Sequence, residues 1–231
     1  MNYLIGLSAG HQNIANNCVF PLRSGTGANG EAQLNIAVRD ALGAILISKG
    51  FKVQLDDANS NCQPNTTDKD FSFYLAIHAE GAPGGGCISA PDPSVDSANN
   101  LSKQICAAIE SQYFSYTGIQ NRPELITDNM RYYYVFNSLS SANPCGIIEL
   151  GGITDPHDKV ILANIDKVAQ GIARGICKAF SVPYDAPIPP LPPVKPTDKQ
   201  YLLMVRDIVR GKGNSWAKIT TLTKLMTTIG I

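Results

Sequence analysis

A chain of 231 residues with 44% apolar and 16% charged side chains is long enough for one well-buried domain and a small second module. Its 19 basic and 19 acidic side chains balance, so no overall field favours nucleic acid as a partner. Residues 1–183 carry 12 Lys and Arg against 16 Asp and Glu, a net charge of −4, whereas residues 184–231 carry 7 against 3, a net charge of +4.

Six cysteines are spread along the chain without a Cys-x-x-Cys pair, which excludes a zinc knuckle and a thioredoxin motif. Buried, reduced thiols fit their apolar surroundings. The chain opens directly into an apolar strand, without the regions of a secretory signal, and no stretch approaches the length of a membrane span. We therefore expect a protein that is made in the cytosol without a signal peptide.

Three apolar runs each end on a side chain that is able to do chemistry. Residues 2–10 lead into His11, residues 71–77 into His78, and residues 145–148 into Glu149. Small and apolar residues occupy both faces of these runs, which is typical of strands buried in an α/β sheet. Sites in open α/β sheets lie outside the carboxyl ends of the strands, so we expect these three side chains to converge at one edge.

Helical periodicity separates the apolar runs. Helices are predicted from Gly30 to Gly50, over residues 96–113, and after Asp158 to about Phe180; further strands are predicted over residues 51–55, 87–89 and 131–136. This alternation predicts an α/β fold, a mainly parallel twisted sheet with helices on both faces. Tyr132, Tyr133 and Tyr134 fall in the last of these strands, where a mixed core and surface strand is favoured over a sugar- or peptide-binding groove.

The end of the chain has a different composition. Residues 183–196 contain seven prolines and are predicted to form a semi-rigid linker. Residues 197–231 then predict a small module of two amphipathic helices, which at about 35 residues is too short for an independent core. We expect this module to dock on the domain formed by residues 1–182, to self-associate, or to be marginally stable.

The residues at the sheet edge suggest a catalytic metal. Two imidazoles and a carboxylate leave a fourth position on zinc for water, which is the arrangement of catalytic zinc sites. His11 and His78 supply two ligands, and Glu31 is the best third because it begins the helix that follows the loop after His11. Glu149 then becomes the general base that takes a proton from water and returns it to a leaving nitrogen.

Structural interpretations of the same residues stay open at this point. A histidine in a core is more often structural than a ligand, and Glu31 fits a carboxylate favoured by a helix N-terminus. The third histidine, His157, lies at a helix start that Asp155 is able to cap, so it is a weaker ligand candidate.

Four motifs in order resemble a known family. They are residues 5–11 (IGLSAGH), 27–31 (GANGE), 75–80 (LAIHAE) and 146–152 (GIIELGG). This series is similar to the zinc-dependent N-acetylmuramoyl-L-alanine amidases of the autolysin and phage-endolysin type, over roughly residues 1–182. Glu80 stands where that family usually has Asn or Asp, and Gly152 where it frequently has Phe.

The resemblance implies specific roles. His11, Glu31 and His78 would bind Zn²⁺, and Glu149 would be catalytic. The reaction would cleave the amide between the lactyl group of N-acetylmuramic acid and the L-alanine of the peptidoglycan stem peptide. Residues 205–214 are also similar to a small wall-binding repeat of some phage lysozymes, with a docking or dimerising hairpin as the alternative.

We therefore expect a phage endolysin that waits in the host cytoplasm and acts at the bacterial cell wall, with peptidoglycan as its partner and neither nucleic acid nor a membrane span involved. Self-association through the C-terminal helices is a further expectation. Two rivals are a zinc carboxypeptidase-like peptidoglycan peptidase and a wall-binding protein without activity.

Overall fold

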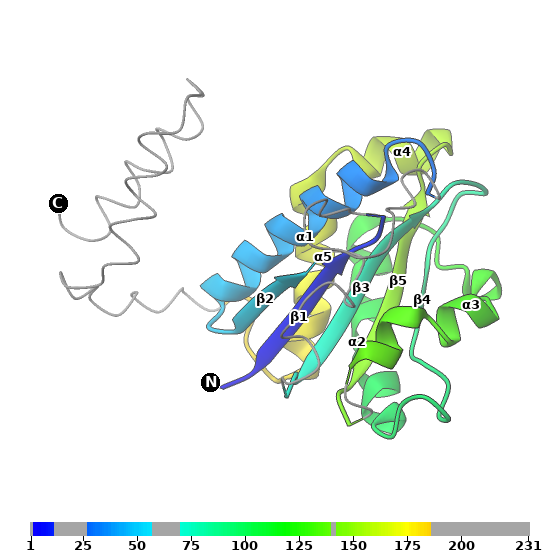
Figure 1. The fold of residues 1–231 in the computed structure, drawn as a ribbon. Helices are drawn as coiled ribbons and strands as arrows, with labels where there is room; N and C mark the ends of the chain where they lie inside the picture. Colours follow the sequence, from blue (N-terminus) through cyan, green and yellow to red (C-terminus); the bar gives the residue numbers. More distant parts are fainter. Residues whose placement is uncertain (1, 12–26, 57–69, 140–141, 186–231) are drawn as a thin grey trace, which may run out of the picture. The chain divides into compact units, whose positions relative to one another are not determined.

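The structure is a computed structural model that describes residues 2–11, 27–56, 70–139 and 142–185 (Figure 1). The predicted helical module at 197–231, and all but the first three residues of the predicted linker at 183–196, lie outside the described residues. Most of the loop after His11 lies outside them as well.

A five-stranded sheet forms the centre of the domain, in the order β2-β1-β3-β5-β4. The strands are β1 (Leu4–Ala9), β2 (Lys52–Asp56), β3 (Phe73–Glu80), β4 (Cys87–Ser89) and β5 (Cys145–Gly152). All neighbours pair in parallel except β4, which runs antiparallel to β5. The predicted mainly parallel α/β sheet is thus confirmed, and the carboxyl ends of β1, β3 and β5 meet at one edge (Figure 1).

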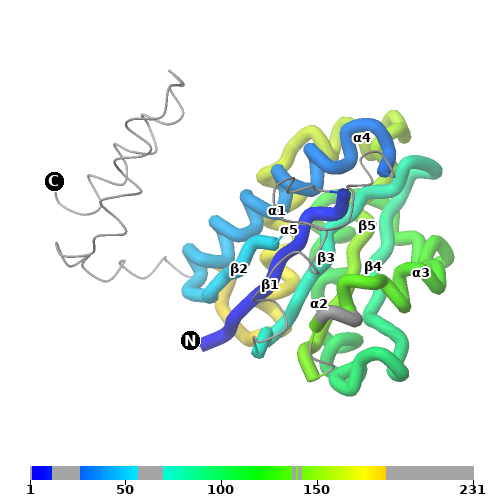
Figure 2. Tube along the Cα trace, in the orientation of Figure 1, coloured from blue at the N-terminus to red at the C-terminus, as the bar shows by residue number. Residues whose placement is uncertain are grey.

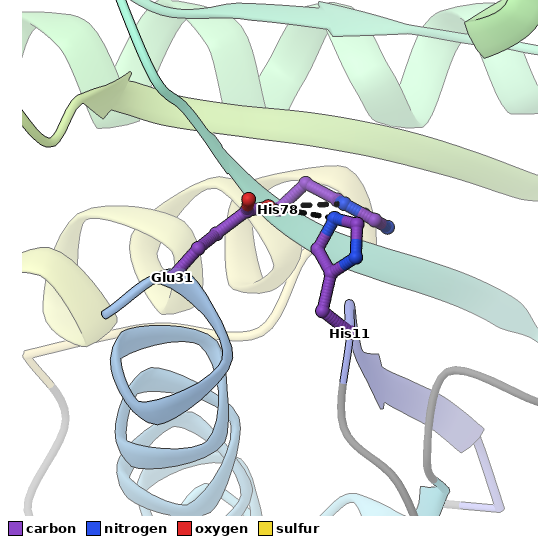
Figure 3. A group of neighbouring side chains, drawn as sticks. All are labelled: His11, Glu31 and His78. Atoms are coloured by element: carbon purple, nitrogen blue, oxygen red, sulfur yellow. Dashed lines mark ion pairs between the residues drawn. The ribbon is translucent and has the colours of Figure 1, made fainter. Parts of the chain in front are cut away.

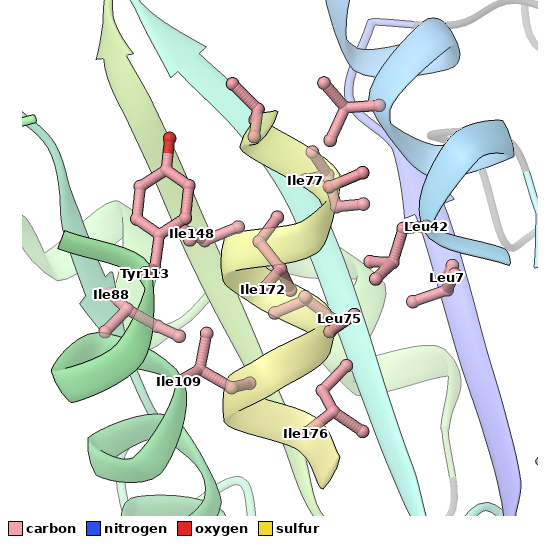
Figure 4. Close-up of a cluster of buried hydrophobic side chains, with 14 of the residues drawn as sticks. Leu7, Leu42, Leu75, Ile77, Ile88, Ile109, Tyr113, Ile148, Ile172 and Ile176 are labelled. Carbon is pink, nitrogen blue, oxygen red and sulfur yellow. The ribbon is translucent and has the colours of Figure 1, made fainter. Parts of the chain in front are cut away.

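Three long helices cover one face of the sheet. They are α1 (Glu31–Ser48), α2 (Asn99–Thr117) and α5 (Ile165–Ala179), with α5 packed against both of the others. Along α5, Val168, Ile172 and Ile176 recur at four-residue spacing and are fully buried in the core that Figure 4 shows. Each such side chain contributes roughly 1.5–3 kcal/mol by leaving water.

The third predicted helix is divided in two. Asp155 caps α4 (Pro156–Leu162), with its side chain accepting hydrogen bonds from the backbone N–H groups of His157 and Asp158. The Asn164 side chain accepts from the Lys167 N–H group and starts α5. An asparagine that caps a new helix competes with continuation of the old one, which explains the break.

The opposite face is covered by short helical turns, η2 (Pro123–Leu125), α3 (Asp128–Arg131) and η3 (Tyr134–Ser138) (Figure 2). The prediction of a strand over residues 131–136 is therefore wrong. Val135 and Phe136 are buried against this sheet face, in a cluster with Tyr74 and Ile147. Aromatic residues favour a half-buried pleated surface, but here they pack onto an existing sheet instead of pairing with its edge.

Alternation along the strands decides the face from which each site residue projects. Ala76 and Ile147 belong to the cluster on the face opposite α5. Because successive side chains point to opposite faces, His78 shares the face of Ala76, and Glu149 shares that of Ile147. Both side chains therefore lie at the carboxyl edge, on the side covered by the turns between α2 and β5.

Among the described residues, no helix is long and apolar enough to cross a membrane.

Candidate metal centre

Three residues far apart in the sequence come together at the carboxyl edge of the sheet (Figure 3). His11 follows β1, Glu31 is the first residue of α1, and His78 lies in β3. Glu31 Oε1 is 3.2 Å from His11 Nε2 and 3.3 Å from His78 Nδ1. One nitrogen or oxygen from each of the three side chains lies within 4.8 Å of the others, so the group has the dimensions of a metal site.

Backbone contacts bring the histidines to this point. The Gly10 N–H donates to Ile77 O over 2.7 Å, which continues the β1–β3 pairing up to the site. His11 then adopts φ 59°, a left-handed conformation that turns the chain at the strand end. The amide of Asn35, one turn beyond Glu31 in α1, donates to Gly10 O over 3.1 Å and so ties the helix to the strand end.

Glu31 is a buried carboxylate with many donors around it. Burial alone would raise its pKa, but hydrogen bonds from His11, His78 and the Ala28 N–H group outweigh burial and hold the pKa well below its usual range. The Ala28 N–H group lies 2.9 Å from Oε2. The pKa of His11 is raised, chiefly by its hydrogen bond to Glu31. The negative charge of Glu31 is thus present and available to a cation.

Gly10 permits the close approach of His78. A Cβ at this position would lie 2.4 Å from His78 Cε1. We expect Gly10→Ala to displace the ring, to lower the free energy of unfolding by about 1–3 kcal/mol, and to weaken the binding of a metal ion by this group. Thermal unfolding and a chelator competition measure both effects.

Gly81→Ala is the matched control for this variant, because a Cβ there would meet only Ala28 Cβ, at 3.4 Å. A Gly10→Ala protein that matched Gly81→Ala in both measurements would show that His78 does not need this space.

Glu149 lies beside the group on the neighbouring strand. It pairs in register with His78, so the two side chains project side by side from the same face. Burial raises the pKa of Glu149 well above its usual range, and the charges of Glu80 and Glu31 raise it further. A carboxyl group with a raised pKa, next to two imidazoles and a second carboxylate, has the properties of a proton-transfer group.

Comparison with known proteins agrees with this geometry. Residues 5–178 match the N-acetylmuramoyl-L-alanine amidase family. The chain belongs to that family. A comparison with curated protein sequences gave no match.

Solved structures share the fold of this amidase domain. The Ami1 amidase of Mycobacterium smegmatis is 19% identical with a TM-score of 0.60, and the match covers 78% of this chain and 97% of that one. The CwlD amidase of Clostridioides difficile, in complex with the GerS lipoprotein, is 20% identical with a TM-score of 0.58, over 79% of this chain and 100% of that one. The catalytic domain of the CD27L endolysin targeting Clostridia difficile is 15% identical with a TM-score of 0.54, over 77% of this chain and 97% of that one.

His157, the remaining histidine of this amidase, lies in a second group with Asp155 and Asp158. The carboxylates of this group already serve the backbone. Asp155 caps α4, and Asp158 Oδ2 accepts from the N–H groups of Gly85, at 2.5 Å, and Gly152, at 2.9 Å. The His157 side chain is 69% exposed. Asp155 therefore serves as a helix cap and Asp158 as an anchor for the loop before β4. Neither residue belongs to the group at the sheet edge.

The two departures from the family pattern have different surroundings. A Cβ at residue 152 would lie 2.8 Å from Gly84 Cα, so the loop after β3 occupies the space that a larger side chain would need. Glu80 instead adds a negative charge close to Glu149, as the pKa of Glu149 reflects. Gly152 therefore alters the shape of the surface beside the site, and Glu80 alters its charge.

Two residues in contact with the site were not predicted from the sequence. Asn35 holds Glu31 and Gly10, and its position four residues after Glu31 in a helix was a usable signal. The Tyr133 hydroxyl lies 2.9 Å from His78 Nε2. No pattern in the sequence predicted that contact, because it forms between β3 and the turns that cover it.

Proposed function

We propose that the chain is a zinc-dependent peptidoglycan amidase that cleaves the amide between the lactyl group of N-acetylmuramic acid and the L-alanine of the stem peptide. The observation that carries this proposal is the meeting of His11, Glu31 and His78 beside Glu149, in a chain of the N-acetylmuramoyl-L-alanine amidase family. Family membership supports the substrate class, and the side-chain geometry supports the chemistry.

The residues present fit zinc. Imidazole nitrogen and carboxylate oxygen are both ligands that zinc takes in proteins, and three protein ligands are the number found in catalytic sites, where water completes the set. His11, Glu31 and His78 would hold the ion, which when bound supplies a lowered water pKa and a polarised substrate carbonyl. The deprotonated state of Glu31 suits this task because its pKa is held low.

Glu149 acts first as general base and then as general acid in this proposal. Its carboxylate accepts the proton of the water that attacks the carbonyl carbon, and the resulting carboxylic acid gives that proton to the nitrogen of L-alanine as the C–N bond breaks. The raised pKa of Glu149 favours the protonated form that acts as the acid. The products are a free lactyl carboxyl group and a peptide with a new amino terminus.

Glu80 contributes, after burial, to the raised pKa of Glu149 and so to the pH range of this step. Its negative charge disfavours ionisation of Glu149, so Glu80→Gln lowers the pKa of Glu149. Glu149 must be ionised to accept a proton from water, so a lower pKa makes it active at lower pH. We expect the acid limb of the pH profile of kcat/KM to move to lower pH in Glu80→Gln. An unchanged acid limb would show that Glu80 does not affect the pKa of Glu149.

Product analysis tests the proposed reaction. Purified cell walls are digested with the protein, and the soluble products are analysed by mass spectrometry. We expect intact stem peptides that begin with L-alanine, together with glycan strands that carry free lactyl groups. Peptides shortened at a terminal residue would favour the carboxypeptidase-like rival. Wall binding without released products would favour a binding protein.

Three narrower expectations stay predictions from the sequence. They are the role of a phage endolysin, a location in the host cytoplasm before lysis, and wall binding or self-association by residues 197–231. The division into a catalytic domain over 1–182, a linker over 183–196 and a helical module also stays a prediction.

A further inference from the structure

We propose that Tyr133 is a positioning residue of the metal site, whose hydroxyl oxygen fixes the proton of His78 on Nε2 and leaves Nδ1 free to face the metal. This inference rests on the proposed function in taking His78 as a ligand. It adds a residue to the site from a segment that none of the four family-like motifs contains.

The two nitrogens of His78 face different partners. Nδ1 points to the metal group, where it hydrogen-bonds Glu31 Oε1 over 3.3 Å, and it would give up that proton to bind an ion. Nε2 lies 2.9 Å from the Tyr133 hydroxyl. The His78 and Tyr133 rings meet edge to face, with centroids 5.2 Å apart and planes at 88°. The tyrosine therefore touches His78 on the side away from the ligand cluster.

This contact determines which nitrogen of His78 carries the proton when the other nitrogen binds a metal. A neutral imidazole carries one proton, and the nitrogen that binds a metal cannot carry it. With Nδ1 toward the metal, the proton belongs on Nε2 and needs an acceptor there, because His78 is only 7% exposed to solvent. A phenol oxygen accepts such a proton while keeping its own. Partners of this kind set both the tautomer and the orientation of a ligand histidine.

Packing holds Tyr133 in place. The Thr127 side chain caps α3 just before it, accepting from the Met130 N–H group. Met130 and Phe136, on either side of Tyr133 in the sequence, are 6% and 2% exposed against the sheet, and the ring centroids of Tyr133 and Phe136 are 5.7 Å apart. The position of the hydroxyl is therefore set by the segment that covers this face of the sheet, and through it the ligand histidine is coupled to that segment.

The neighbouring tyrosines offer a matched control. Tyr132 is 47% exposed, and its side chain makes a hydrogen bond to Asp92 instead of to a metal-site residue. Tyr132→Phe removes one hydroxyl from the same run as Tyr133→Phe does. Both variants keep the aromatic ring, so a difference between them reports on the contact with His78.

Two measurements on the zinc-loaded full chain test the inference. In a competition with a chromophoric chelator, Tyr133→Phe is expected to bind zinc about 10- to 100-fold more weakly than the wild type, and Tyr132→Phe within about twofold of it. In proton NMR, the wild type is expected to show a slowly exchanging His78 Nε2–H signal. That signal should exchange faster with water in Tyr133→Phe.

The outcomes separate this inference from the proposed function. A wild type that binds zinc, with an equal affinity in Tyr133→Phe, would overturn the inference alone. A His78 ring protonated on Nδ1 in the zinc-loaded wild type would overturn it without any variant, so the test does not depend on how the variant folds. A wild type that binds no zinc would overturn the proposed function and the inference together.

Discussion

Replacing Glu149 with glutamine is expected to lower kcat for peptidoglycan hydrolysis by about 10²–10⁴-fold while leaving zinc binding intact. Glutamine keeps the shape of the side chain but cannot accept the proton of the attacking water. The residue lies beside His78 in the sheet and outside the group whose atoms converge on Glu31, so zinc affinity should not depend on it. Rates on purified walls and chelator competition measure the two quantities.

Glu149→Gln lowers activity in this account, but it should not lower the free energy of unfolding of the metal-free protein. The folded state raises the pKa of Glu149 above its unfolded value, so folding favours the protonated form, and stability falls as pH rises from the unfolded pKa to the folded pKa. Glutamine removes this loss. In the metal-free protein at neutral pH, the free energy of unfolding of Glu149→Gln should therefore equal or exceed that of the wild type.

Glu124→Gln provides the control for Glu149→Gln, because that carboxylate is 62% exposed and pairs with Arg122 at the surface. It should leave rate, zinc affinity and stability unchanged. Wild-type rates in Glu149→Gln would remove Glu149 from the mechanism. A loss of zinc binding in that variant would instead place it among the ligands.

Replacing His78 with alanine is expected to abolish both hydrolysis and the stabilisation of the protein by zinc. A ligand that binds only the folded state stabilises it by an amount that rises with the logarithm of the ratio of free concentration to Kd, about 2.7 kcal/mol at a ratio of 100. The wild type should therefore unfold at a higher temperature when zinc is added to the metal-free protein. His78→Ala should show almost no such shift, because it lacks one of three ligands.

Two further variants make this test specific. His11→Ala should give the same loss of the zinc response, and its ring is more exposed, so its removal disturbs the core less. His157→Ala should respond to zinc as the wild type does, because its side chain is at the surface beside the α4 cap. A zinc response that disappeared in His157→Ala and persisted in His78→Ala would move the metal to the second group.

Much of the fold was predictable because its signals are local. The buried runs ending at His11, His78 and Glu149 form β1, β3 and β5, and the helical spacing after Gly30 forms α1. The rule that sites lie at the carboxyl ends of parallel strands then predicted that these residues would be neighbours. The predictions that were wrong concern features that depend on tertiary packing or on a helix cap. The aromatic run after α3 covers a sheet face, and a capping asparagine divides the last predicted helix.

The candidate site divides in the same way. His11, Glu31 and His78 could be found from the sequence because His11 follows a strand and Glu31 begins a helix, while His78 lies near the end of a strand that continues to Glu80. Tyr133 could not be assigned to the site, because its contact depends on how a covering segment docks on the sheet, whereas the four-residue spacing from Glu31 was a signal for Asn35. The roles of all these residues stay predictions until metal and activity are measured.

Anomalous diffraction at the zinc edge, from crystals of the zinc-loaded full chain, tests the central claim most directly. We expect a single strong peak bounded by His11 Nε2, Glu31 Oε1 and His78 Nδ1, about 2.0–2.2 Å from each. A peak at Asp155, His157 and Asp158, or none in crystals of protein that binds zinc in solution, would contradict the account.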